Sequence, residues 1–136
     1  MRLKAQLRKD GNHWLIESKE LDLMTQGRTR KEAVIMLKDA VESLVNDEGF
    51  NINIEDVDQG DVFFSSNNVS ILLALMLRRM REASDLTLSE VAKALGVNSP
   101  NAYGRYEQGR STPSLDKLSE LLRAINPAYD LVLEVR

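Results

Sequence analysis

The sequence predicts an α+β protein, in which a small antiparallel sheet with one helix precedes an all-helical part that ends in a strand. Three observations support this fold class. Short alternating segments separated by turn residues fill the chain up to residue 57, helix start and stop signals dominate from residue 69, and residues 129–135 alternate again. At 136 residues the chain accommodates one or two small domains.

The first residues follow a hairpin pattern. Residues 3–9 and 14–18 are strand-like and flank the turn-forming triplet DGN. A third short strand is predicted over residues 21–26, and Gly27 ends it. The chain therefore begins with three consecutive strands.

A helix and a fourth strand complete this first part. Thr29, followed three residues later by Glu32, is a capping-box signal for a helix that runs to about Asn46, with apolar residues every three or four positions. Residues 50–57 (FNINIEDV) alternate as a strand. The order βββαβ predicts an antiparallel sheet with a helix on one face, and we assign it to a domain of residues 1–60.

A second domain is predicted over residues 69–136. Residues 61–68 mix turn-forming residues with two phenylalanines and are predicted to be a linker. The next helix, residues 69–84, contains the run ILLALML, which is apolar on every side. Since a helix packed on one face shows only a stripe, this helix is expected to bury a second face against the linker, the first domain or another subunit.

Two short helices follow. Thr87 and Glu90 form a second capping-box signal, and this helix closes at Gly96. Ser99 is placed to cap the next helix, which has Pro100 at its first position, where a proline costs no hydrogen bond. Two short helices joined by a glycine-containing turn make a helix-turn-helix motif, whose second helix can enter the major groove of DNA.

The chain closes with one more helix and a strand. The helix follows Pro113 and stops before Pro127. In residues 129–135 (YDLVLEV) every second residue is apolar, which predicts a strand that needs a partner. A homodimer would supply that partner, although packing of the strand and of the apolar helix within one chain remains the alternative.

Composition limits the classes of function. The net charge of −3 is uneven, because residues 1–66 carry −4 and residues 67–136 carry +1, which leaves room for a basic face in the second part. With no cysteine and one histidine, His13, no metal site is expected, and the lack of cysteine fits the reducing cytoplasm. A metal-dependent nuclease needs carboxylates from separate elements. The acidic residues here are local, so no catalytic site or cofactor is expected; they are Glu55, Asp56, Asp58 and Asp61.

Residues 86–125 resemble the Xre (lambda-repressor-like) family. The matching motifs are LT at 86–87, EVA at 90–92, LGV at 95–97, RYEQGR at 105–110 and PSLDKL at 113–118. The resemblance implies that Asn101 and Arg105, early on the third helix, read bases; asparagine suits adenine and arginine suits guanine.

The same resemblance implies the other contacts. Thr87, Ser99 and Arg110 match positions that touch phosphate, and Glu107 matches a carboxylate that pairs with an arginine of the first helix, Arg81 by register. The expected DNA-binding set is Thr87, Ser99, Asn101, Ala102, Arg105 and Arg110.

Residues 1–60 resemble the HicB antitoxin family, whose N-terminal domain is a partial RNase H fold. The resemblance is carried by the hairpin from residue 2, by TQG at 25–27 and by the T-x-x-E-A helix start at 29–33. It implies a cytoplasmic antitoxin that neutralises a HicA-type mRNA-degrading toxin through its first domain. The second domain would repress the operon by binding operator DNA as a homodimer or a higher oligomer. The alternative is an Xre-type repressor with no toxin, whose first domain senses a ligand or dimerises.

Overall fold

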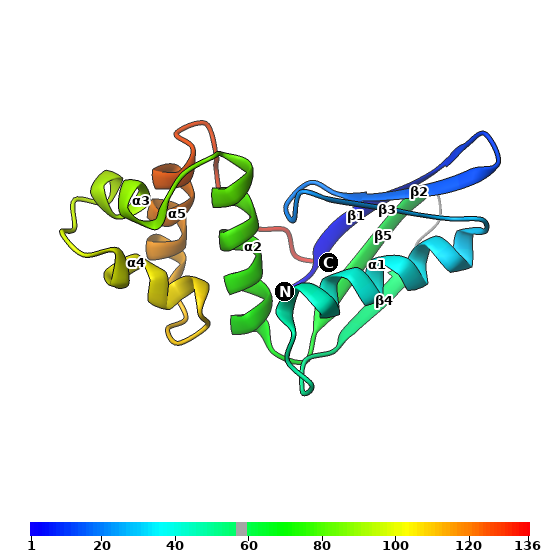
Figure 1. The fold of residues 1–136 in the computed structure, drawn as a ribbon, viewed down its shortest axis with the longest axis horizontal. Helices are drawn as coiled ribbons and strands as arrows, with labels where there is room; N and C mark the ends of the chain where they lie inside the picture. The colour runs from blue at the N-terminus through cyan, green and yellow to red at the C-terminus, as the bar shows by residue number, and fades with distance from the viewer. Residues whose placement is uncertain (57–59) are drawn as a thin grey trace.

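The computed structural model describes residues 1–56 and 60–136, which form a sheet-and-helix part and a helical part on either side of one long helix (Figure 1). The strands are β1 (Leu3–Asp10), β2 (His13–Ser18), β3 (Leu23–Gly27), β4 (Ile52–Asp56) and β5 (Asp61–Ser66). The helices are α1 (Arg30–Val45), α2 (Val69–Ala83), α3 (Leu88–Ala94), α4 (Pro100–Glu107) and α5 (Leu115–Ile125). The α+β class predicted from the sequence is confirmed.

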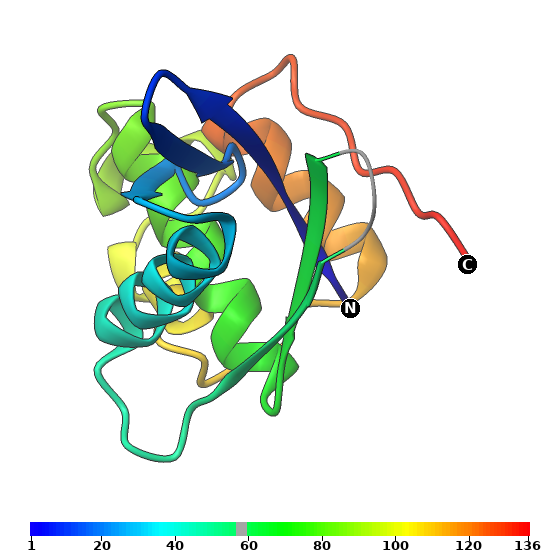
Figure 2. The same cartoon turned by 90° about the vertical axis from the view of Figure 1, so that its right-hand side faces the viewer.

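The five strands form one antiparallel sheet in the order β3-β2-β1-β5-β4. The predicted hairpin is present, with Gly11 at its turn in the left-handed region (φ 58°). Helix α1 covers one face of the sheet, as Figure 2 shows from the side. The residues of β1 that point to this face are apolar and buried; they are Leu3, Ala5 and Leu7.

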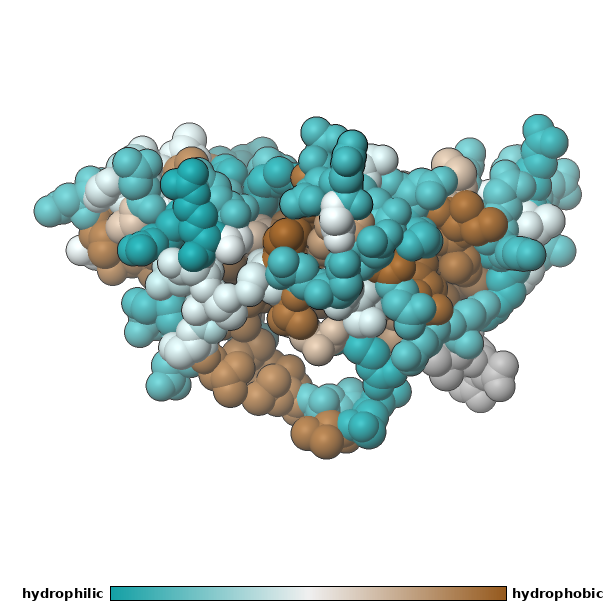
Figure 3. All heavy atoms as spheres, turned by 90° about the horizontal axis from the view of Figure 1, so that it is seen from below, coloured by the Kyte–Doolittle hydropathy of each residue, from teal (hydrophilic) through white to brown (hydrophobic). Residues whose placement is uncertain are grey.

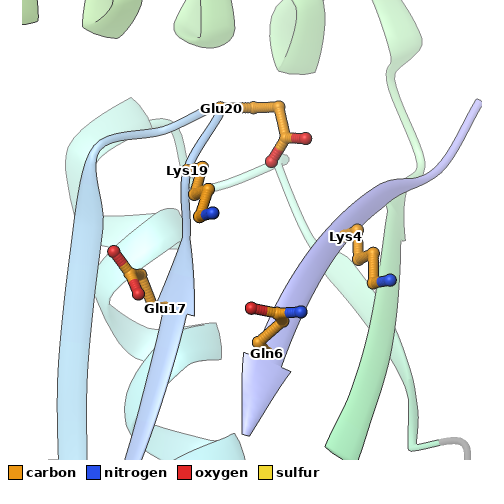
Figure 4. A pocket seen from close by; sticks show the side chains of 5 residues that line it. All are labelled: Lys4, Gln6, Glu17, Lys19 and Glu20. Atoms are coloured by element: carbon orange, nitrogen blue, oxygen red, sulfur yellow. The ribbon is translucent and has the colours of Figure 1, made fainter.

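The other face of the sheet carries polar side chains. A shallow hollow of about 210 Å³ lies on this face next to the β2–β3 turn, and Figure 4 shows the side chains that line it. Its lining has two basic side chains, two acidic ones and one amide; the residues are Lys4, Lys19, Glu17, Glu20 and Gln6. Alternation along β1 therefore separates an apolar face under α1 from a polar face.

The predicted linker at residues 61–68 is wrong, because residues 61–66 are strand β5. This strand lies inside the sheet between β1 and β4, and Val62 and Phe64 are fully buried under α1. Phe63 points to the opposite face, where the guanidinium groups of Arg2 and Arg136 lie 5.1 and 5.0 Å from its ring centre. The first part is thus βββαββ, with one strand more than predicted, and it extends to residue 66.

Two smaller predictions also need correction. Strand β3 begins at Leu23 rather than at residue 21, because Asp22 adopts a left-handed conformation (φ 47°) that ends the preceding turn. The predicted strand over residues 129–135 is not formed, and these residues run as an extended segment without a ladder partner. Val57, the last residue of the predicted fourth strand, and Asp58 lie outside the described residues.

Helix α2 packs against both parts, which explains why its sequence is apolar on all sides. Six consecutive residues, Leu72–Leu77, are buried, and the helix contacts α4 and α5 on one side and β5 and α1 on the other. Arg78 donates to the carbonyl of Leu44 at the end of α1 (2.9 Å). Arg79 donates to the carbonyls of Leu21 and Asp22 (2.8 Å each). The second buried face predicted for this helix is therefore provided by the first part of the same chain.

The helix boundaries of the second part agree with the capping signals. Thr87 and Glu90 form a complete capping box, with Thr87 Oγ1 accepting from Glu90 N (3.1 Å) and Glu90 Oε1 accepting from Thr87 N (3.2 Å). Ser99 and Ser114 cap α4 and α5. None of the helices described is long and apolar enough to cross a membrane.

Candidate nucleic-acid interface

Helix α4 has one buried face and one exposed face, as a DNA-reading helix requires. Tyr103 and Gly104 are buried against the domain. Asn101, Ala102 and Arg105 are all exposed. Because a helix turns about 100° per residue, positions 101, 102 and 105 share one side and lie opposite Tyr103. The structure therefore brings together the three residues of α4 that the sequence identified.

An ion pair between α2 and α4 fixes the orientation of this helix. The Arg81 guanidinium binds the Glu107 carboxylate through two hydrogen bonds, Nε–Oε1 at 2.7 Å and Nη2–Oε2 at 3.0 Å. Arg81 Nη1 also donates to the carbonyl of Leu86 at the start of the turn before α3 (2.8 Å). Only 14% of the Arg81 side chain and 6% of the Glu107 side chain are exposed. The predicted Arg81–Glu107 pair is thus formed, and it ties together α2, the α2–α3 turn and α4.

The Arg81–Glu107 pair and burial shift the pKa values of Arg81 and of the neighbouring Tyr103. The hydrogen bonds to Glu107 raise the pKa of Arg81, which keeps this guanidinium charged. Burial, together with the adjacent Glu107 carboxylate, raises the pKa of the Tyr103 phenol. Tyr103 therefore packs as a neutral aromatic residue under α4. The sequence reasoning did not single out Tyr103; the signal that could have found it is helix periodicity, which places Tyr103 opposite Asn101 and Arg105 on α4.

The predicted phosphate-contacting residues lie around the exposed face of α4. Thr87 and Ser99 are the N-caps of α3 and α4, and both residues are exposed. Each hydroxyl accepts a backbone N–H, which leaves its own hydrogen available for a phosphate oxygen. Arg110 follows α4 and is exposed.

The chain after α4 is held in a fixed path. Gly109 has φ 69°, and the N–H of Arg110 returns to the carbonyl of Arg105 (3.0 Å), which closes the helix end. The hydroxyl of Thr112 is hydrogen-bonded to that of Ser70 on α2. The backbone is therefore tied to α4 at Arg110 and to α2 at Thr112.

The other residues that the sequence singled out are placed elsewhere. His13 is exposed at the start of β2, and no metal-binding group of three or more His, Cys, Asp or Glu is found in residues 1–56 and 60–136. Three carboxylates of the acidic run each form a separate ion pair; the pairs are Glu55 with Arg2, Asp56 with Arg30 and Asp61 with Lys4. Asp58 is outside the described residues. These acidic side chains therefore pair with basic residues in β1, just before β1 and in α1, and they do not converge on one site.

Comparisons with known proteins agree with the geometry of the second part. Residues 72–127 match a family model described as a helix-turn-helix domain. The chain is also 37% identical over 57 residues to a Bacillus subtilis (strain 168) protein named as an uncharacterized HTH-type transcriptional regulator, YobD. The aligned segment is 42% of this chain and 50% of that relative, so the chain spans about half of the relative's length. Residues 72–127, which run from α2 to just beyond α5, are a helix-turn-helix domain.

Proposed function

We propose that this protein is a sequence-specific DNA-binding transcriptional regulator that reads its site with α4. The observation that carries the proposal is the exposed Asn101–Arg105 face on a helix whose opposite side is fixed by Tyr103 and by the Arg81–Glu107 pair. The helix-turn-helix match and the name of the bacterial relative support it.

The residues divide into two groups by the part of DNA that they contact. Asn101 and Arg105 approach base edges in the major groove, where an amide matches adenine and a guanidinium matches guanine. Thr87, Ser99 and Arg110 bind phosphates on either side, which sets the register of the helix but carries no sequence information. Ala102 sits between the two base-reading residues and is small enough to let the helix approach closely, or to contact a thymine methyl group.

The regulator acts as a homodimer. One helix-turn-helix makes few phosphate contacts, and a single module therefore binds weakly at physiological salt. Two copies related by a twofold axis place two α4 helices on half-sites about one turn of DNA apart. The exposed apolar residues after α5 favour a second copy as partner.

The first part gives the protein a second role, that of an antitoxin. The resemblance of residues 1–60 to HicB antitoxins supports the proposal that this part binds and blocks a HicA-type mRNA-degrading toxin, while the second part represses the operon that encodes both. The polar face of the sheet, with its charged hollow, is the surface of the first part that α1 leaves free for a protein partner. In this role the protein is not an enzyme and uses no cofactor.

DNA binding is tested by fluorescence anisotropy of the full-length protein on the DNA upstream of its own gene and on scrambled DNA, across a salt series. We expect tighter binding to the upstream DNA and a steep loss of affinity with salt, because phosphate contacts release counterions. Equal affinity for the two DNAs at every salt concentration would overturn the regulator proposal.

Toxin neutralisation is tested with the product of the adjacent small gene in an mRNA cleavage assay. We expect cleavage by that product and its suppression by stoichiometric full-length protein, whether or not operator DNA is present. Cleavage that continues unchanged would remove the antitoxin role. It would leave the alternative regulator, whose first part senses a ligand or dimerises.

A further inference from the structure

The segment after α5, residues 129–136, which we call the tail, is extended and unpaired. In the part of the chain that the structure describes, residues 130–136 make no backbone–backbone hydrogen bond. Three apolar side chains of the tail are largely exposed, Val132 at 80%, Leu133 at 68% and Val135 at 97%. Apolar residues exposed to this extent next to one another in a strand-like sequence indicate a segment whose partner is missing.

The tail is nevertheless held at both ends. Tyr129 and Leu131 pack against the hydrophobic core, and the N–H of Tyr129 donates to the carbonyl of Asn126 (2.9 Å). At the other end the Arg136 guanidinium lies over the ring of Phe63 in β5. Figures 1 and 2 show the tail running from α5 towards the sheet, apart from the other strands. In Figure 3 it is the apolar strip along the lower edge of the molecule. The backbone is therefore already stretched for pairing with another strand.

The order of charges in the tail selects a second copy of the tail and a particular register. In an antiparallel pair centred on Leu133, Asp130 of each copy stands opposite Arg136 of the other, so two opposite-charge pairs form. A pair centred on Val132 would place Asp130 opposite Glu134 twice, and one centred on Glu134 would place that residue opposite itself. Like charges directly opposite each other are unfavourable, so of these three registers only the one centred on Leu133 uses the charges favourably. A register centred on Val135 would also pair Glu134 with Arg136, but it would join only residues 134–136, whereas the one centred on Leu133 joins residues 130–136.

The apolar residues fit the same register. Leu131, Leu133 and Val135 share one face of the extended chain. With Leu133 opposite itself and Leu131 opposite Val135, two tails present one continuous apolar face. Leu131 packs against the hydrophobic core, whereas Leu133 and Val135 on the same face are exposed and are the apolar residues left for a second tail to cover.

We infer that the tails of two copies pair as antiparallel strands centred on Leu133, and that this ribbon joins the two helix-turn-helix domains. The inference rests on the proposed dimer, to which it assigns the contact surface. It commits to a second copy of this chain as the partner, on the basis of the self-complementary charges of the tail.

A single cysteine tests the register, because the chain contains none of its own. In the proposed ribbon residue 133 faces residue 133 of the other copy, with Cα atoms about 4.5–5.5 Å apart, which a disulfide can bridge. Residue 132 faces residue 134 instead. We therefore expect Leu133→Cys to form a disulfide-linked dimer in glutathione buffer, whereas the control Val132→Cys, at a more exposed position, stays unlinked.

Charge exchange gives a second readout that needs no cross-link. Asp130→Arg should raise the dimer dissociation constant roughly tenfold by sedimentation, because it replaces two opposite-charge pairs with two like-charge pairs. The double variant Asp130→Arg with Arg136→Asp should restore dimerisation, while a role of Asp130 in its exposed pair with Arg123 alone (3.7 Å) predicts no such rescue.

The outcomes separate the inference from the proposed function. Cross-linking at 132 but not at 133 would overturn the register. A dimer that cross-links at neither position would overturn the tail contact and leave the dimer itself. A protein that sediments as a monomer would overturn both, and the DNA titration would still decide whether α4 reads DNA.

Discussion

Asn101 and Arg105 are the residues of α4 whose removal should change DNA recognition without changing the fold. Both are exposed, and neither takes part in the Arg81–Glu107 pair. We expect Asn101→Ala and Arg105→Ala each to weaken binding to the specific site by about 1–3 kcal/mol, with a much smaller effect on scrambled DNA. Fluorescence anisotropy measures this difference, and thermal unfolding verifies that each variant is folded.

A matched control for Arg105 is Arg123→Ala. Arg123 is also an exposed arginine, but it lies near the end of α5 rather than on α4. Its removal lowers the net charge equally and should leave the preference for the specific site intact. Unchanged affinity in both the Asn101 and the Arg105 variants would contradict the assignment of α4 as the reading helix.

Glu42 provides a residue whose effect on stability depends on pH. Its carboxylate accepts from Lys38 Nζ (2.6 Å) and from the N–H of Ile52 (3.0 Å), while Lys38 Nζ donates to the carbonyl of Ile52 (2.8 Å). The two residues thereby occupy backbone groups at the free edge of β4. The hydrogen bond from Lys38, followed by that from Ile52, lowers the pKa of Glu42 below its ordinary value of 4.5.

A carboxyl group whose pKa is lower in the folded state stabilises the fold fully above its unfolded pKa, and the effect is lost as the pH falls through the folded pKa. We therefore expect Glu42→Gln to lower the free energy of unfolding by about 1 kcal/mol at neutral pH, and by less once the pH is below 4.5. Urea unfolding of both proteins at neutral pH and below pH 4.5 measures these differences in the free energy of unfolding. An equal loss at both would show that the carboxylate charge of Glu42 does not contribute.

At the scale of elements, the contact between β3 and α1 depends on Gly27. A Cβ atom at this buried position would lie 2.4 Å from the backbone N of Ala33 and 2.8 Å from the backbone C of Glu32. These atoms belong to the first turn of α1 and cannot move without displacing the helix. We expect Gly27→Ala to lower the free energy of unfolding by at least about 2 kcal/mol, measured by urea denaturation.

The control for Gly27 is Gly49→Ala, in the loop after α1. A Cβ at Gly49 would meet only the Asp47 carboxylate oxygen, at 3.4 Å. This position should tolerate alanine with a change well under 1 kcal/mol. Similar losses in the two variants would mean that the close approach of β3 to α1 is not what requires a glycine.

The sequence predicted elements well where their signals are local. Capping residues such as Thr29, Thr87 and Ser99 bind backbone groups two or three residues away, so the helix starts could be predicted from neighbours alone. Strand β5 was missed because its neighbours are turn formers, and its central place in the sheet depends on β1, some sixty residues earlier. The tail has the alternation of a strand, but a strand also needs a partner, which its own sequence does not supply within one chain.

The candidate DNA-binding site could also be predicted only in part from the sequence. The exposed face of α4 follows from helix periodicity, and the Arg81–Glu107 pair from the family resemblance. The contacts of Arg78 and Arg79 were not predictable, because they bind backbone carbonyls, and a carbonyl has no signature in the sequence. Tertiary packing alone decides that Arg78 and Arg79 turn towards the first part and Arg81 towards α4.

At the scale of the whole molecule, α2 makes the two parts one body. Arg78 and Arg79 bind the first part, while Arg81, on the same helix, binds α4. The buried run Leu72–Leu77 lies between them. The first part therefore lies at a fixed position relative to the exposed face of α4.

Whether the two parts unfold together can be measured with two probes. Trp14, the only tryptophan, lies in β2 and reports on the first part, whereas most of the helices lie in the second part and dominate the circular dichroism signal. In the natural protein we expect urea unfolding followed by Trp14 fluorescence and by far-UV circular dichroism to give the same midpoint, since α2 belongs to both cores. Replacing Arg78 and Arg79 with alanine leaves the carbonyls of Leu44 and Leu21 without their donors, and should separate the two midpoints. The control Arg8→Ala, which removes an exposed ion pair with Glu17, should keep them together. Coincident midpoints in the double variant would show that apolar packing of α2 alone holds the two parts together.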